Sequence, residues 1–106
     1  MRGPIPKKPK HKALDLDAAE AIGLQGLGFL AADDDRIAKF LGLTGILPND
    51  LIANAKTAEM LLAVLEYLAQ DEQLLLQFAG EAEIQPEIAI EAMRLLEPTG
   101  QANFSD

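Results

Sequence analysis

The chain has 106 residues, of which 49% are hydrophobic, 5% are aromatic and none is cysteine. This composition fits one helical domain, or two very small ones, and excludes a disulfide framework and a thiolate metal site. The net charge is −8, yet the first twelve residues hold five basic and no acidic side chains, which leaves four basic against 17 acidic residues in the remainder. So acidic a body repels nucleic acid and anionic membranes, and no apolar run reaches the ~20 residues of a transmembrane helix. We expect a cytoplasmic protein.

Residues 1–12 are predicted to form a disordered basic arm, because three prolines alternate with lysines and no apolar period is present. The arm could contact nucleic-acid phosphates, but it has no aromatic side chain to stack on bases and is attached to an acidic body. A solubilising or loosely attached tail is the simpler interpretation. The candidate phosphate contacts are Lys7, Lys8, Lys10 and Lys12.

The first half of the folded region is predicted to contain three helices. The first begins near Asp17, which forms a capping-box variant with Glu20, and ends near residue 32. Asp33 caps the second, and Gly42 and Gly45 supply the turn after it. The third starts at Pro48, with Ile46 placed to contact Leu51. The apolar residues expected on the first two helices are Ile22, Leu24, Leu27, Leu30, Ile37, Phe40 and Leu41.

The second half is predicted to repeat this scheme. Thr57 caps a fourth helix and Asp71 a fifth, Gly80 turns the chain, and Pro86 opens a last helix that ends near Leu96. The inward residues expected here are Leu61, Val64, Leu65, Leu68, Leu75, Phe78 and Ala79.

An internal duplication supports this reading. Residues 27–56 align with residues 65–94 at a constant offset of 38 and without a gap. We therefore predict an all-α fold in which two tandem three-helix repeats, 17–56 and 57–96, share one core within a domain of residues 13–97, with a pseudo-two-fold axis and a flexible tail from residue 98. The identical pairs are Leu27/Leu65, Leu30/Leu68, Ala31/Ala69, Asp33/Asp71, Phe40/Phe78, Gly42/Gly80, Ile46/Ile84, Pro48/Pro86 and Ile52/Ile90.

Two differences between the copies have structural or functional implications. Gly23 and Gly26 stand where the second copy has leucine and valine, which indicates either a weakened helix or, as we favour, the close approach of a neighbouring helix. Leu74 and Leu76 stand where the first copy has arginine and alanine. They either bury against the first copy, which is the simpler interpretation, or form a protein-interaction surface.

No residue pattern indicates catalysis or a metal. The only histidine, His11, lies in the arm, and Ser105 lies in the tail. Carboxylate pairs such as Glu87 with Glu91 and Glu59 with Glu66 have the spacing of an ordinary solvated helix face. Residues 33–35 are read as the acidic start of a helix. We expect no catalytic residue, no metal site and no cofactor.

Residues 29–31, 40–48, 65–68 and 71–79 resemble a DUF3572-like family of short alphaproteobacterial proteins of unknown function. The resemblance covers residues 14–97 and implies the helical fold and a bacterial cytoplasmic setting, with no functional residue to transfer. Together these features favour a non-enzymatic protein that binds an unknown protein partner or a second copy of itself. A nucleic-acid-associated accessory role through the arm and an enzyme of unknown reaction are the alternatives.

Overall fold

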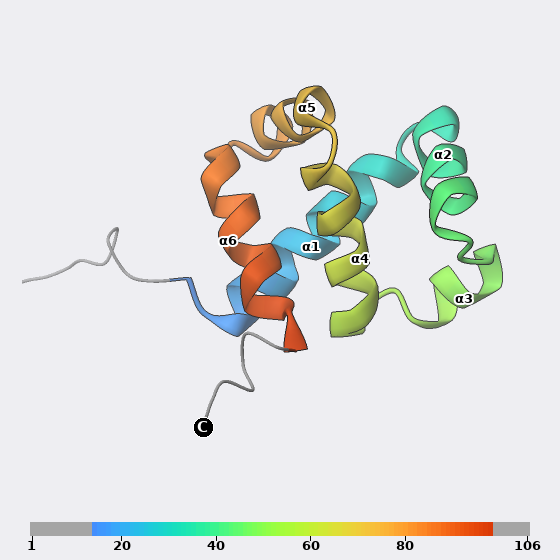
Figure 1. Ribbon diagram of the computed structural model, residues 1–106, viewed down its shortest axis with the longest axis horizontal. Helices are drawn as coiled ribbons and strands as arrows, with labels where there is room; N and C mark the ends of the chain where they lie inside the picture. Colours follow the sequence, from blue (N-terminus) through green and yellow to red (C-terminus); the bar gives the residue numbers. More distant parts are fainter. Residues whose placement is uncertain (1–13, 99–106) are drawn as a thin grey trace, which may run out of the picture.

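The computed structural model describes residues 14–98, and six α-helices account for most of them (Figure 1). Within this range there is no strand, so the all-α, six-helix prediction is confirmed. The arm with Lys7, Lys8, Lys10 and Lys12, and the tail from residue 99, lie outside the described residues. The helices are α1 (Leu16–Ala31), α2 (Asp34–Thr44), α3 (Pro48–Ala53), α4 (Ala58–Ala69), α5 (Glu72–Ala82) and α6 (Pro86–Leu96).

The core is built where α1, α4 and α6 pack against one another, while α2 attaches to α1 and α5 to α4 and α6. Figure 1 shows α4 crossing α1, with α6 beside them on one side and the α2–α3 segment on the other. The core draws on both predicted halves, since Phe40 and Phe78 are both almost completely buried. Its largest fully buried side chains are Phe40, Phe78, Leu30, Leu61, Leu65, Leu68 and Val64.

Side-chain caps start most of the long helices. Asp33 Oδ1 accepts hydrogen bonds from two amides at the start of α2, Thr57 Oγ1 accepts one at the start of α4, and Asp71 Oδ1 accepts one at the start of α5, as predicted. For α1 the predicted start is wrong. The cap is Asp15, whose carboxylate accepts the N–H of Ala18 at 2.8 Å, and the helix begins two residues earlier than expected.

Two of the predicted glycine turns are wrong. Gly42 and Gly80 lie inside α2 and α5, where an interior glycine costs only about 1 kcal/mol and does not by itself end a helix. The turns come three residues later, in left-handed backbone, at Gly45 (φ +77°) and at Glu83 (φ +59°). Gly45 is the residue type that this conformation favours, whereas Glu83 adopts it with a side chain.

The glycines of α1 lie where α4 crosses it. A Cβ atom at Gly23 would be 2.8 Å from the Cβ atom of Leu61, and one at Gly26 would be 3.1 Å from side-chain atoms of Val64 and Leu68. The favoured interpretation, close approach of a neighbouring helix, is therefore confirmed. Leu24, one of the apolar residues expected on this helix, is 41% exposed, because it lies about 200° around the helix from Ile22.

The third helices of the two predicted repeats are not equivalent in space. Helix α6 has eleven residues and buries Ala89, Ala92 and Leu96. Helix α3 has six residues and buries none, although Leu51 packs partly against the core. A two-fold relation between the halves therefore does not extend to α3 and α6, and the tandem organisation itself stays a prediction.

Candidate interaction surfaces

Leu74 and Leu76, the two residues predicted as a possible interaction surface, differ in their exposure. Leu74 is partly buried and packs against the core, whereas Leu76 is 50% exposed and lies beside Gln73 and Gln77 in a shallow depression. The two side chains are about 200° apart around α5, so they do not form one patch. Leu76 alone remains available at this surface.

Arg36, the counterpart of Leu74, has a structural role that the sequence did not reveal. Its Nη1 donates to the carbonyl oxygen of Phe29 at 2.8 Å, and its guanidinium carbon lies 4.0 Å from the centroid of that ring. The Phe29 carbonyl belongs to the last turn of α1, where carbonyls lack partners within the helix. Arg36 therefore caps α1 and covers an aromatic face, and does not belong to a solvated surface.

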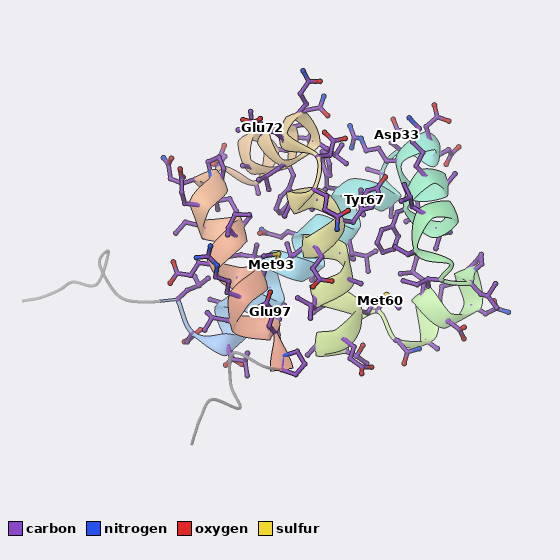
Figure 2. All side chains as sticks on the ribbon, in the orientation of Figure 1. Asp33, Met60, Tyr67, Glu72, Met93 and Glu97 are labelled. Carbon is purple, nitrogen blue, oxygen red and sulfur yellow. The ribbon has the colours of Figure 1, made fainter. Side chains whose placement is uncertain are left out.

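Two aromatic pairs join the halves. Phe29 of α1 lies 5.7 Å from Phe78 of α5, and Phe40 of α2 lies 5.2 Å from Tyr67 of α4 in an edge-on arrangement. Phe29 and Tyr67 are counterparts in the two halves, 38 residues apart, and so are Phe40 and Phe78. The two aromatic pairs therefore join matched positions of the duplication. Tyr67 lies on the side of α4 that faces α2 (Figure 2).

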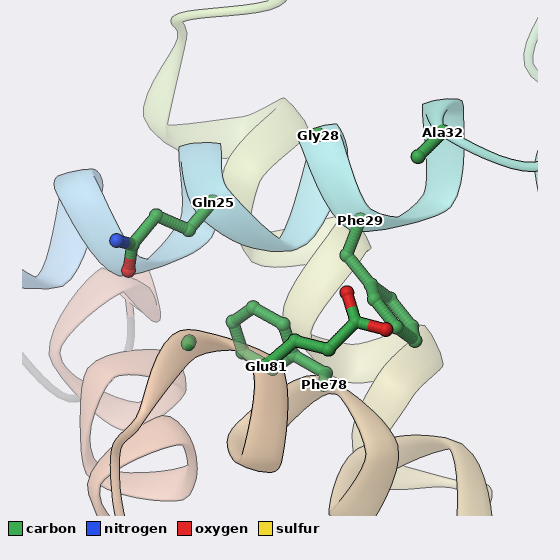
Figure 3. A pocket seen from close by; sticks show the side chains of 7 residues that line it. Gln25, Gly28, Phe29, Ala32, Phe78 and Glu81 are labelled. Atoms are coloured by element: carbon green, nitrogen blue, oxygen red, sulfur yellow. The ribbon is translucent and has the colours of Figure 1, made fainter.

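A groove includes residues of each aromatic pair: Phe29 and Phe78 both line the first, and Tyr67 lines the second. The α1–α5 groove has a volume of about 300 Å³, and in the view of Figure 3 the Glu81 carboxylate lies between the rings of Phe29 and Phe78, with Gln25 to one side. It is lined by Gln25, Gly28, Phe29, Ala32, Phe78, Glu81 and Ala82. The α2–α4 groove has a volume of about 190 Å³ and is lined by Leu43, Thr44, Ala63, Glu66, Tyr67 and Gln70. Each of these six residues lies 38 positions from a residue that lines the first groove.

The matched positions differ in chemistry. On one wall, Leu43 of the α2–α4 groove takes the place that Glu81 has in the α1–α5 groove. On the other wall, Glu66 takes the place of Gly28. The α2–α4 groove therefore has an apolar side chain on one wall and a carboxylate on the other. The α1–α5 groove has a carboxylate on one wall and Gly28 on the other, and a Cβ atom added to Gly28 would meet no neighbour within 4 Å.

The most exposed apolar side chains lie where α2 turns into α3. Leu43 and Ile52 are each 75% exposed and Leu47 is 63% exposed; we call these three residues the α2–α3 corner. Their counterparts in the second half are Glu81, Gln85 and the partly buried Ile90. Sequence reasoning missed this corner, although the aligned pairs Leu43/Glu81 and Leu47/Gln85 contained the signal.

Within residues 14–98, no group of three or more histidine, cysteine or acidic side chains could hold a metal ion. No helix in the same range is long and apolar enough to cross a membrane.

The arrangement defines an all-α domain whose distinctive features are surface grooves and an apolar corner. The model of the family described as "Protein of unknown function (DUF3572)" matches residues 16–99, and the chain belongs to this family. No curated protein and no solved structure matches the chain.

Proposed function

We propose that the protein acts without catalysis, by binding another protein through the α2–α3 corner. The observation that supports this proposal is the exposure of Leu43, Leu47 and Ile52. Scattered single apolar residues are normal on a surface, whereas three large exposed ones within ten residues mark a candidate interaction surface. The cysteine-free sequence supports a cytoplasmic setting for this interaction.

The second half supplies an internal comparison. At the positions of Leu43 and Leu47 it has Glu81 and Gln85, both exposed. The same stretch of helix end and turn thus forms with polar residues, so the leucines are not needed to build it. An apolar side chain that the fold does not need, and that water disfavours, supports a role in binding.

The test is a pair of variants compared with the wild-type protein. Leu43→Glu with Leu47→Gln gives the corner the residues of the second half, and Leu76→Gln removes the other exposed leucine as a matched control. We expect affinity capture from the native host to recover a partner with the wild type and with Leu76→Gln, and to lose it with the corner variant. Partner recovery unaffected by the corner variant, or lost only with Leu76→Gln, would contradict the proposal.

A further inference from the structure

We propose that the α2–α4 groove receives the apolar face of a basic amphipathic helix from a partner protein. This inference rests on the proposed function and specifies its partner. The groove adjoins the corner, because Leu43 belongs to both. Leu43 of α2 and Ala63 and Tyr67 of α4 supply apolar lining on both sides of the groove. The polar side chains of Thr44, Glu66 and Gln70 supply the rest of the lining.

The size of the groove favours a side chain over a free small molecule. Its volume of about 190 Å³ lies below the ~300 to 1,000 Å³ of typical small-molecule sites. A helix laid across such a groove inserts one or two side chains and leaves its remaining contacts to the surrounding surface. Leu47 and Ile52 are exposed on the segment that follows Leu43 in the chain, and they offer apolar surface in addition to the groove.

The charge of the groove favours a basic partner. Glu66 is the only ionisable carboxylate among the lining residues, and none of them is basic. Glu66 is exposed at the groove wall, where a lysine or arginine of the partner can reach it. The acidic body adds an attractive long-range field for a cation and a repulsive one for a second acidic copy.

The area of the corner also argues against a second copy as the occupant. Three exposed side chains offer apolar surface in the range of a few hundred Å² that is usual for the largest patch of a monomer. A stable dimer needs about 800 Å² from each partner. A contact of this size suits a short helical segment that binds reversibly.

The α1–α5 groove is the internal control for this inference. Phe29 lines it at the position of Tyr67, but Glu81 replaces the apolar Leu43 and Gly28 replaces Glu66. A peptide selected for the α2–α4 groove should therefore be insensitive to changes at Glu81.

The experiment is a peptide-display selection on the full chain with random 16-residue peptides, followed by affinity measurement on folded variants. We expect selected peptides to place apolar residues at helical spacing together with lysine or arginine. Leu43→Glu should weaken their binding about tenfold or more, and Glu66→Gln should weaken it severalfold. The control Glu81→Gln should change it less than about twofold.

The possible failures are distinguishable. Selected peptides could depend on Leu43 and yet be acidic, lack helical spacing or bind Glu66→Gln as well as the wild type. Any of these results would overturn the inference of a basic helical partner and would leave the proposed function standing. Failure to select any peptide, or selected peptides that ignore Leu43→Glu, would overturn the inference, and the capture experiment would then decide the proposed function separately. A wild-type dimer in sedimentation that Leu43→Glu dissociates would instead show that the occupant is a second copy.

Discussion

Helices α3 and α6 begin alike and end in different places. Both start at a proline, after an isoleucine two residues earlier that is identical in the two halves. Helix α6 then buries Ala92 completely between its neighbours, whereas the matched position in the first half is Asn54, which ends α3. Asn54 Nδ2 donates to the carbonyl oxygen of Asp50 at 2.9 Å, and burying such a polar side chain as α6 buries Ala92 would be unfavourable in the first half. The same starting signals therefore yield a core helix in one half and a peripheral one in the other.

The comparison teaches that duplicated sequence does not imply duplicated burial. The first two helices of each half keep their matched contacts: the Phe29–Phe78 and Phe40–Tyr67 pairs exchange when the halves are exchanged. The third helices do not. The first half, whose third helix buries no side chain, is also the half that exposes Leu43, Leu47 and Ile52. We therefore propose the binding role for this half.

The largest expected effect tests the part of the comparison in which the halves agree. Phe40 and Phe78 occupy matched, almost fully buried positions. Truncating either to alanine should lower the free energy of unfolding by about 3 to 5 kcal/mol, as measured by chemical denaturation. A near-neutral result at either position would show that the two halves do not share one core.

A smaller effect is expected where α4 crosses α1. Gly23→Ala should destabilise the protein by about 1 to 3 kcal/mol, because the new methyl group meets the Cβ atom of Leu61 on a packed backbone. Gly28→Ala is the matched control in the same helix: its methyl group enters open space, so it should stabilise the protein by up to about 1 kcal/mol. Equal thermal shifts for the two variants would contradict the close crossing.

The isoleucines at matched positions of the third helices should respond differently. Ile90 packs against the core, so Ile90→Ala should cost about 1 to 2 kcal/mol of stability. Ile52 is 75% exposed, so Ile52→Ala should change stability by less than about 0.5 kcal/mol. Denaturant midpoints measure both, and a loss at position 52 as large as that at position 90 would mean that α3 contributes to the core.

The smallest expected effect concerns the turns after α2 and α5. Glu83 has left-handed backbone that its counterpart Gly45 adopts without a side chain. Glu83→Gly should therefore stabilise the protein by about 0.5 to 1 kcal/mol, and Gly45→Ala should destabilise it by a similar amount. Melting midpoints that move in the opposite directions would show that other contacts decide these turns.

Much of the fold was predictable because local chemistry decided it. Asp33, Thr57 and Asp71 cap their helices with contacts that reach only two or three residues along the chain. Gly42 and Gly80 misled because a glycine marks only a possible turn, and each helix continues for two residues beyond its glycine. Asp15 and Asp17 are both residues of the type that caps a helix, and in the structure Asp15 is the cap.

The candidate site was less predictable because it depends on what remains exposed after packing. Leu74 and Leu76 looked equivalent in the sequence, yet only Leu76 is left at the surface. The exposed corner includes the short, peripheral α3, which buries no side chain, whereas α6 packs against α1 and α4. Local propensity does not show which third helix packs against α1 and α4, because both start at a proline that follows an isoleucine two residues earlier.

Native-state amide hydrogen exchange tests the central claim most directly, namely that α6 belongs to the core and α3 does not. We expect the most protected amides of α6 to exchange with a free energy of opening close to that of global unfolding. We expect the amides of α3 to open with a free energy several kcal/mol lower, because the helix buries no side chain. Protection of α3 equal to that of α6 would contradict the account, since a helix that unfolds only with the whole domain would be part of the core.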